Sequence, residues 1–238
     1  MPAQAEPGRQ AGGDRWSDLR LRVLSAAVLL PVALYCLYAG GIAWNVLVLA
    51  ATLGLLWEWW RMWRLRPGSH MPEVVKLLLG WAYILAGAAA LHWLRTDEAG
   101  LLNVLFVLVI VWASDIGAYL AGRMIGGPKL APAISPGKTW SGAIGGLAIA
   151  VLVGLAVSQA VHPGPPLHAV VLGAVLSIAS QIGDLIESAA KRHFGVKDSS
   201  RIIPGHGGLF DRLDGVLAAA PLAAALELML GPGQELWR

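Results

Sequence analysis

The stretch LLNVLFVLVIVWASDIGAYL, residues 101–120, is twenty residues long and contains one charged side chain, Asp115. A helix needs about 20 mostly apolar residues to cross the hydrocarbon of a bilayer. Because lipid offers no water to an open backbone, the run predicts a membrane-spanning helix. A carboxylate in such a helix is costly, so Asp115 is expected to have a partner. A snorkelling or salt-bridged carboxylate without a chemical role is the alternative.

Further apolar runs on both sides extend the same interpretation to the whole chain. The sequence is 56% hydrophobic and 14% charged, whereas soluble domains carry about 25% charged residues. We therefore predict an all-α, polytopic transmembrane helix bundle, with a polar tail over residues 1–22. A re-entrant hairpin around Gly40 and Gly41 is an equally good alternative to two separate spans there. The seven predicted spans are residues 23–41, 42–60, 77–94, 101–120, 142–161, 167–186 and 213–230.

The basic residues predict how the bundle is oriented. With a cytoplasmic N-terminus and seven spans, all Lys and Arg residues except Arg95 and Arg238 lie on the cytoplasmic side. This asymmetry is the usual bias of membrane proteins and supports the predicted topology. We expect a multi-pass protein of the bacterial inner membrane. The net charge of +3 is too small and too dispersed to indicate a nucleic-acid partner.

Small residues recur every fourth position in the run over residues 142–161. They share one helical face, so another backbone can approach it closely. Packing within the chain is the favoured interpretation, and a homodimer seam is the alternative. The stripe consists of Gly142, Gly146, Ala150, Gly154 and Ser158.

Polar side chains begin where the sixth span ends, in QIGDLIESAAKRHF, residues 181–194. Asp184, Glu187, Ser188 and Lys191 are spaced three and four apart and so form one stripe on a helix. Glu187 and Lys191 could simply be an ion pair. Two or three carboxylates with several cations indicate a divalent cation and phosphates, and Mg²⁺ is typically held by one or two carboxylates plus substrate phosphates.

The other charged loop is GGPKLAPAISPGKTWSG, residues 126–142. Its Gly-Lys-Thr ending imitates a P-loop, but that motif requires glycine where the chain has Pro132. The loop can still bind phosphate oxygens through Lys138 and backbone N–H groups. Between two glycines, His206 is expected to have a hydrogen-bonding role, because no second His or Cys stands at metal-ligand spacing.

The run SAAKRHFGVKDSSRIIPGHGGLFDRLD, residues 188–214, resembles the signature of the phosphatidate cytidylyltransferases, also called CDP-diacylglycerol synthases. Residues 114–146 resemble a second conserved region of that family, although no role is carried over to Ser141. The resemblance covers residues 101–238, which would form the catalytic membrane domain after N-terminal membrane helices over residues 23–100.

The resemblance implies that CTP and phosphatidate react at the cytoplasmic membrane face to give CDP-diacylglycerol and pyrophosphate. It implies that Asp184 and Asp211 hold Mg²⁺ and leaves open whether a monovalent cation also takes part. No role follows for Asp198, and Asp214 and Asp115 are the next candidate ligands. The implied catalytic residues are Asp184, Asp211, Lys191 and Arg212, and the implied substrate-binding residues are Ser135, Lys138, Thr139, Ser188, Arg192, Lys197 and His206.

Two other functions remain open at this point. A CTP-dependent lipid kinase would transfer the γ-phosphoryl group to an alcohol and would need a base for that hydroxyl. A transporter would use Asp115, Asp184 and Glu227 as an ion path and would show internal repeats. The gathering of charge at one membrane face favours the cytidylyltransferase.

Overall fold

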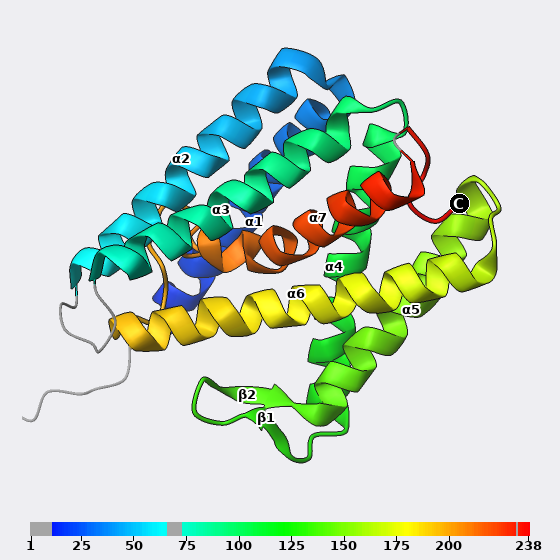
Figure 1. Ribbon diagram of the computed structural model, residues 1–238. Coiled ribbons are helices and arrows are strands. Elements are labelled where there is room, and N and C mark those ends of the chain that lie inside the picture. The colour runs from blue at the N-terminus through cyan, green and yellow to red at the C-terminus, as the bar shows by residue number, and fades with distance from the viewer. Residues whose placement is uncertain (1–10, 66–72, 232) are drawn as a thin grey trace, which may run out of the picture.

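The computed structural model describes residues 11–65, 73–231 and 233–238, with side chains from residue 20 onward. Within these residues, seven helices are long and apolar enough to cross a membrane, which confirms the predicted bundle (Figure 1). The helices are α1 (Ala11–Ala39), α2 (Gly41–Leu65), α3 (Glu73–Thr96), α4 (Gly100–Met124), α5 (Trp140–Val161), α6 (Pro166–Phe194) and α7 (Phe210–Leu230).

Several helices are longer than the predicted spans. α6 continues to Phe194, so the predicted polar stripe is helical, and it ends where Gly195 adopts a positive φ of 71°. The amide of that glycine closes the last turn, which is a common helix ending. α1 begins at Ala11, so half of the predicted polar tail is helical. Residues 1–10 of that tail, and Arg66 of the orientation argument, lie outside the described residues.

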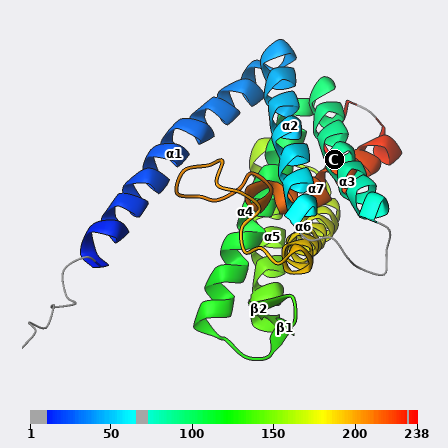
Figure 2. The same cartoon turned by 90° about the vertical axis from the view of Figure 1, so that its left-hand side faces the viewer.

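The junction of α1 and α2 separates two helices that are each long enough to cross a membrane, which favours two separate spans over the re-entrant hairpin. α1 has 29 residues and α2 has 25, so they are about 43 and 37 Å long at 1.5 Å per residue. Arg95 donates to the carbonyl oxygens of Leu37 and Tyr38 at the end of α1. From this junction α1 leans away from the other helices (Figure 2), and only 6% of the apolar stretch of α1 is buried.

The core lies where α4 crosses the antiparallel pair α6 and α7 at a steep angle (Figures 1 and 2). The five small residues of α5 are all buried. A Cβ added to Gly146 would meet Ser114 O of α4 at 2.7 Å, and one added to Gly142 would meet Ala118 O at 2.9 Å. The stripe therefore packs against α4 within the chain, as favoured. A homodimer stays a prediction, and this face of α5 is not free to form its interface.

A small two-stranded sheet interrupts the otherwise helical chain between α4 and α5. Strands β1 (Lys129–Ala131) and β2 (Ser135–Thr139) pair antiparallel, with Lys129 opposite Thr139. Thr139 then caps α5, because its hydroxyl accepts a hydrogen bond from Gly142 N at 3.1 Å. The loop predicted to bind phosphate is thus a short hairpin that places Ser135, Lys138 and Thr139 on β2.

Candidate active site

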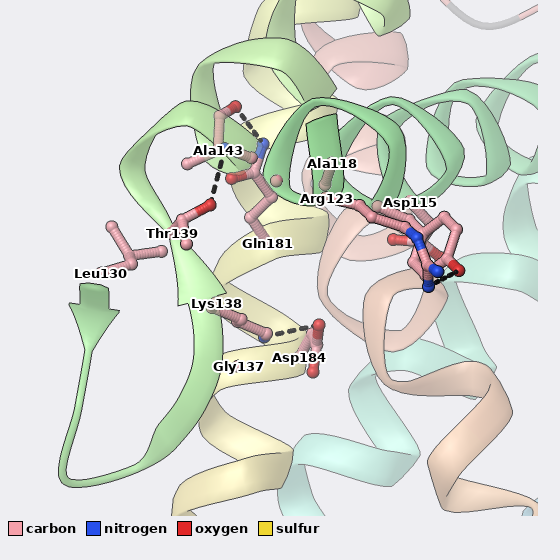
Figure 3. A pocket seen from close by; sticks show the side chains of 13 residues that line it. Asp115, Ala118, Arg123, Leu130, Gly137, Lys138, Thr139, Ala143, Gln181 and Asp184 are labelled. Atoms are coloured by element: carbon pink, nitrogen blue, oxygen red, sulfur yellow. Dashed lines mark hydrogen bonds and ion pairs between the residues drawn. The ribbon is translucent and has the colours of Figure 1, made fainter. Parts of the chain in front are cut away.

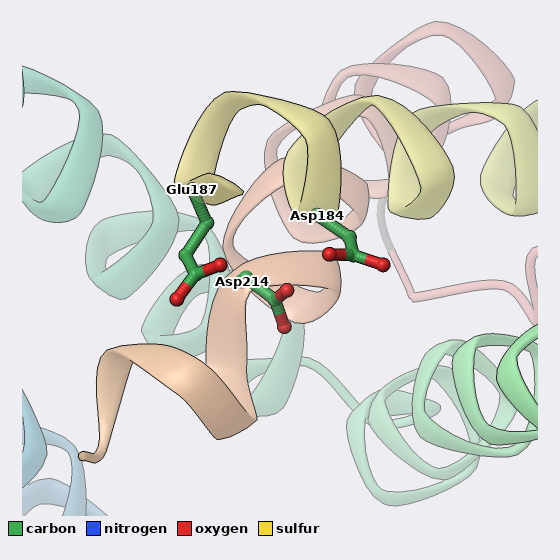
Figure 4. Close-up of side chains that lie close together, drawn as sticks. All are labelled: Asp184, Glu187 and Asp214. Atoms are coloured by element: carbon green, nitrogen blue, oxygen red, sulfur yellow. The ribbon is translucent and has the colours of Figure 1, made fainter. Parts of the chain in front are cut away.

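Three carboxylates converge where α6 and α7 pack together. One oxygen from each of Asp184, Glu187 and Asp214 lies within 4.8 Å of the others (Figure 4). Gly183 permits this approach, because a Cβ at that position would collide with the carbonyl oxygen of Asp214 and with Ala218. We call Asp184, Glu187 and Asp214 the carboxylate group. It contains Asp214, which the sequence analysis named only as a next candidate ligand.

Asp211, the second metal ligand expected from the sequence, lies outside the carboxylate group and is engaged elsewhere. Its Oδ1 is 2.7 Å from Lys191 Nζ. Its Oδ2 accepts hydrogen bonds from Gly208 N at 2.9 Å and from Ser199 N and Oγ, both at 3.1 Å. In this arrangement Asp211 holds the loop over residues 195–209, here called the signature loop, against the first turn of α7.

Lys191 connects Asp211 to the carboxylate group. Its ammonium lies 2.6 Å from Glu187 Oε1 and 2.7 Å from Asp211 Oδ1. The ion pair of Glu187 and Lys191 considered from the sequence therefore exists, but it is part of a larger cluster. Because the Lys191 side chain is only 15% exposed, its charge is held at one place between α6 and α7.

A second cation approaches the carboxylate group from the hairpin. Lys138 Nζ lies 2.5 Å from Asp184 Oδ2 (Figure 3). This pair borders a cavity of about 470 Å³ between α4, α5, α6 and β2. We call it the hairpin cavity; its lining includes Asp115, Tyr119, Lys138, Gly142, Gln181 and Asp184. Asp115, the lone charge of the α4 run, thus faces the same space as Asp184.

The remaining expected residues fall into two sets. Ser188 Oγ is 3.5 Å from Asp184 Oδ1, and Arg192 donates to the carbonyl oxygen of Ile134 in the hairpin turn at 3.2 Å. Both therefore lie near the hairpin side, whereas Lys197 and Asp198 are exposed on the signature loop.

Arg212 and His206 line a different hollow, next to α1. The guanidinium of Arg212 donates from Nε and Nη2 to His206 O, at 3.1 and 2.6 Å. The His206 ring is 2.8 Å from Ser25 Oγ of α1. These hydrogen bonds agree with the structural role expected for His206.

Glu58 of α2 organises the signature loop, and the sequence analysis missed it. Its carboxylate is 0% exposed and accepts hydrogen bonds from Leu209 N at 2.8 Å and Phe210 N at 2.7 Å. The hydroxyls of Ser199 and Ser200 also donate to it. An anion at the first N–H groups of α7 stabilises that helix start. A carboxylate inside an apolar span was the signal that could have identified it.

The contact between Glu58 and the signature loop explains why glycine stands at position 208, in the His-Gly-Gly part of the signature. A Cβ at Gly208 would collide with Ser199 Oγ and would lie 2.8 Å from Glu58 Oε1. Gly207 adopts a φ of 89°, which side chains disfavour. The two glycines therefore allow the signature loop to close onto α2, and that closure brings Asp211 and Asp214 to their positions.

Comparison with known proteins shows which family the chain is similar to. A model of the Cytidylyltransferase family matches residues 66–230. A phosphatidate cytidylyltransferase of Brucella suis biovar 1 (strain 1330) is 38% identical over 253 residues, covering 87% of this chain and 92% of the relative. One of Staphylococcus aureus (strain COL) is 46% identical over 147 residues, covering 61% of this chain and 55% of the relative.

Proposed function

Because the chain belongs to the Cytidylyltransferase family, we propose that it transfers the cytidylyl group of CTP to phosphatidate. The products are CDP-diacylglycerol and pyrophosphate, and the pathway served is phospholipid biosynthesis. The observation that supports this most directly is the carboxylate group flanked by Lys138 and Lys191 at the ends of two membrane helices. A lipid and a polyanionic nucleotide can both reach such a place.

The reaction needs charge neutralisation more than proton transfer. An oxygen of the lipid phosphate attacks the α-phosphorus of CTP, a new P–O bond forms, and the bond from the α-phosphorus to the pyrophosphate oxygen breaks. A phosphate monoester is largely ionised at neutral pH, with a second pKa near ~6, so the nucleophile needs no strong general base. Positioning and electrostatic stabilisation then provide most of the rate enhancement.

The cationic side chains supply that stabilisation from two directions. Lys138 reaches the carboxylate group from the hairpin and Lys191 from α6. We assign Lys138, with Ser135 and Thr139 on the same strand, to the triphosphate of CTP in the hairpin cavity. Lys191 lies on the α7 side and is placed to balance charge on the attacking or leaving phosphate. Arg192, Ser188 and Lys197 stay proposed contacts to the substrates.

The residues present fit a hard divalent cation. Three carboxylates within 4.8 Å of one another offer the oxygen ligands that Mg²⁺ prefers, with substrate phosphates completing its coordination. We propose Asp184 and Asp214 as its ligands, and Asp211 as a further ligand only when Lys191 moves from it to a substrate phosphate. Bound there, Mg²⁺ would neutralise charge on the phosphates of CTP.

The transporter alternative finds little support in the positions of its three carboxylates. Asp115 and Asp184 border one cavity, but Glu227 lies in the last turn of α7, hydrogen-bonded to Asn103. Glu227 follows Asp214 by thirteen positions of helix, which is about 20 Å along the axis.

An isotope experiment tests the proposed reaction against the kinase alternative. Purified protein receives phosphatidate, Mg²⁺ and CTP labelled in either the α- or the γ-phosphate. The α-label should appear in the lipid product and the γ-label in pyrophosphate. Transfer of γ-label to an added lipid alcohol would establish the kinase, and the absence of any transfer from the α-position would overturn the proposal.

A further inference from the structure

A long apolar hollow separates α1 from the rest of the bundle. Its volume is about 710 Å³, and Figure 2 shows α1 leaning away from the other helices on this side. We call it the α1 groove; its walls include Leu30 and Ala33 of α1, Ala51 of α2, Leu108 and Trp112 of α4, and Val216 of α7. These side chains are suited to contact hydrocarbon.

One end of the α1 groove is polar and positively charged. His206 and Arg212 line it there, and Ser25 Oγ joins His206 to α1 at 2.8 Å. A guanidinium carries five N–H donors in a planar fork that suits phosphate oxygens. Arg212 directs its Nε and one Nη at His206 O, so donors remain for an anionic headgroup.

The charged end of the groove and the carboxylate group both include residues of the first turns of α7. Asp214 follows Arg212 by two residues at the start of α7, and α4 contributes Trp112 to the groove and Asp115 to the hairpin cavity. The two helices touch at this level, because a Cβ on Gly215 would lie 3.2 Å from Val111. The hairpin cavity and the α1 groove therefore both border the middle of α4, next to its contact with the first turns of α7.

The depth of the groove corresponds to one leaflet of a membrane. On α1 its wall extends from Ala26 to Leu37, which is about 16 Å of helix. The hydrocarbon core of a bilayer is about 30 Å thick, so one leaflet occupies half of that. A lipid whose headgroup lies at Arg212 would have its acyl chain along the groove.

We propose that the α1 groove binds an acyl chain of phosphatidate and sets the lipid phosphate at Arg212, beside the carboxylate group. This inference rests on the proposed function and adds the path of the lipid substrate to it. Lipid chains are as apolar as the groove, so the groove contributes position rather than affinity. CTP in the hairpin cavity and the lipid in the α1 groove would then approach the carboxylate group from different sides.

Filling the groove tests the proposal. Ala33→Phe and Ala51→Phe place a ring into it, and Ala148→Phe on the exposed face of α5 is the matched control. The groove variants should lower kcat/KM for dioleoyl phosphatidate about tenfold, or roughly 1.4 kcal/mol of transition-state stabilisation. The KM for CTP and the turnover of dihexanoyl phosphatidate should stay unchanged, because a short chain does not reach the ring. Equal losses with both lipids, or an equal loss in Ala148→Phe, would overturn the proposal.

A binding measurement separates this proposal from the proposed reaction. Phosphatidate with a diazirine at the end of one acyl chain should crosslink to α1 and α4 residues of the groove, more than phosphatidylcholine with the same chain. Equal crosslinking of both lipids would mean that bulk lipid fills the groove, which contradicts the proposal. Selective crosslinking without turnover of either phosphatidate would support the groove while refuting the proposed reaction.

Discussion

Replacing Glu58 by Gln should disable the site without touching any substrate. Each Glu58 oxygen accepts from one backbone amide at the start of α7, that of Leu209 or Phe210, and from one serine hydroxyl of the signature loop. The Gln amide group has one acceptor oxygen and an NH₂ that can only donate. A hydroxyl can rotate to accept from that NH₂, but one buried backbone N–H loses its partner.

The magnitude follows from these contacts. An unsatisfied buried N–H costs about 1–3 kcal/mol, and an anion at a helix N-terminus contributes about 0.3–2 kcal/mol. We expect Glu58→Gln to lower the free energy of unfolding by about 2–4 kcal/mol. Because Asp211 and Asp214 lie in the turn that Glu58 holds, a shift of about 1 Å there should lower kcat/KM on the order of 10²-fold.

The assay compares Glu58→Gln with a chemically identical change at the other end of α7. Glu227 is also a buried carboxylate, 1% exposed, and accepts a hydrogen bond from Asn103 at 2.8 Å. Turnover is measured with CTP and phosphatidate at a temperature where both variants remain folded by circular dichroism. Glu227→Gln should keep kcat/KM, whereas Glu58→Gln should lose it, with partial recovery in Glu58→Asp. If folded Glu58→Gln retained more than a third of kcat/KM, the positioning role would be refuted.

Asp214→Asn should lower turnover about 10³-fold, or ~4 kcal/mol, and raise the Mg²⁺ concentration for half-maximal activity. Asp211→Asn should mainly lower thermal stability. If Asp211→Asn raised the Mg²⁺ concentration for half-maximal activity and Asp214→Asn did not, Asp211 would be the ligand instead. Lys138→Met should raise KM for CTP about tenfold and leave KM for phosphatidate unchanged, because Lys138 borders the hairpin cavity; a larger effect on phosphatidate would reverse the assignment of the cavity. In a cysteine-free background, Glu98→Cys should react with an impermeant thiol reagent outside intact cells and Lys197→Cys should not, and the converse would invert the predicted orientation.

Much of the architecture follows from short-range features that a sequence displays. Seven apolar runs predicted seven helices because the length needed to cross a bilayer is a local property. The spacing of Asp184, Glu187 and Lys191 placed them on one face of α6, since positions within a helix are related by its fixed geometry. The buried small residues of α5 belong to the same class of inference.

Contacts between helices were beyond that reasoning. Asp211 and Asp214 lie three residues apart on α7, and the sequence alone favoured Asp211 as the partner of Asp184. The structure places Asp214 in the carboxylate group because Gly183 lets α7 approach α6 at that residue, while Lys191 and the signature loop occupy Asp211. Which side chain faces a neighbour depends on the rotation and separation of two packed helices.

The same reason explains why Glu58 and the α1 groove emerged only from the tertiary structure. Glu58 precedes Ser199 by 141 residues, and the closeness of those two residues is decided by how α2 packs beside the start of α7. The groove exists because α1 leans away from its neighbours (Figure 2). Composition and periodicity determined which segments enter the membrane and which residue types could do the chemistry. Long-range packing decided which of those residues meet, because it depends on shapes that no local pattern in the sequence describes.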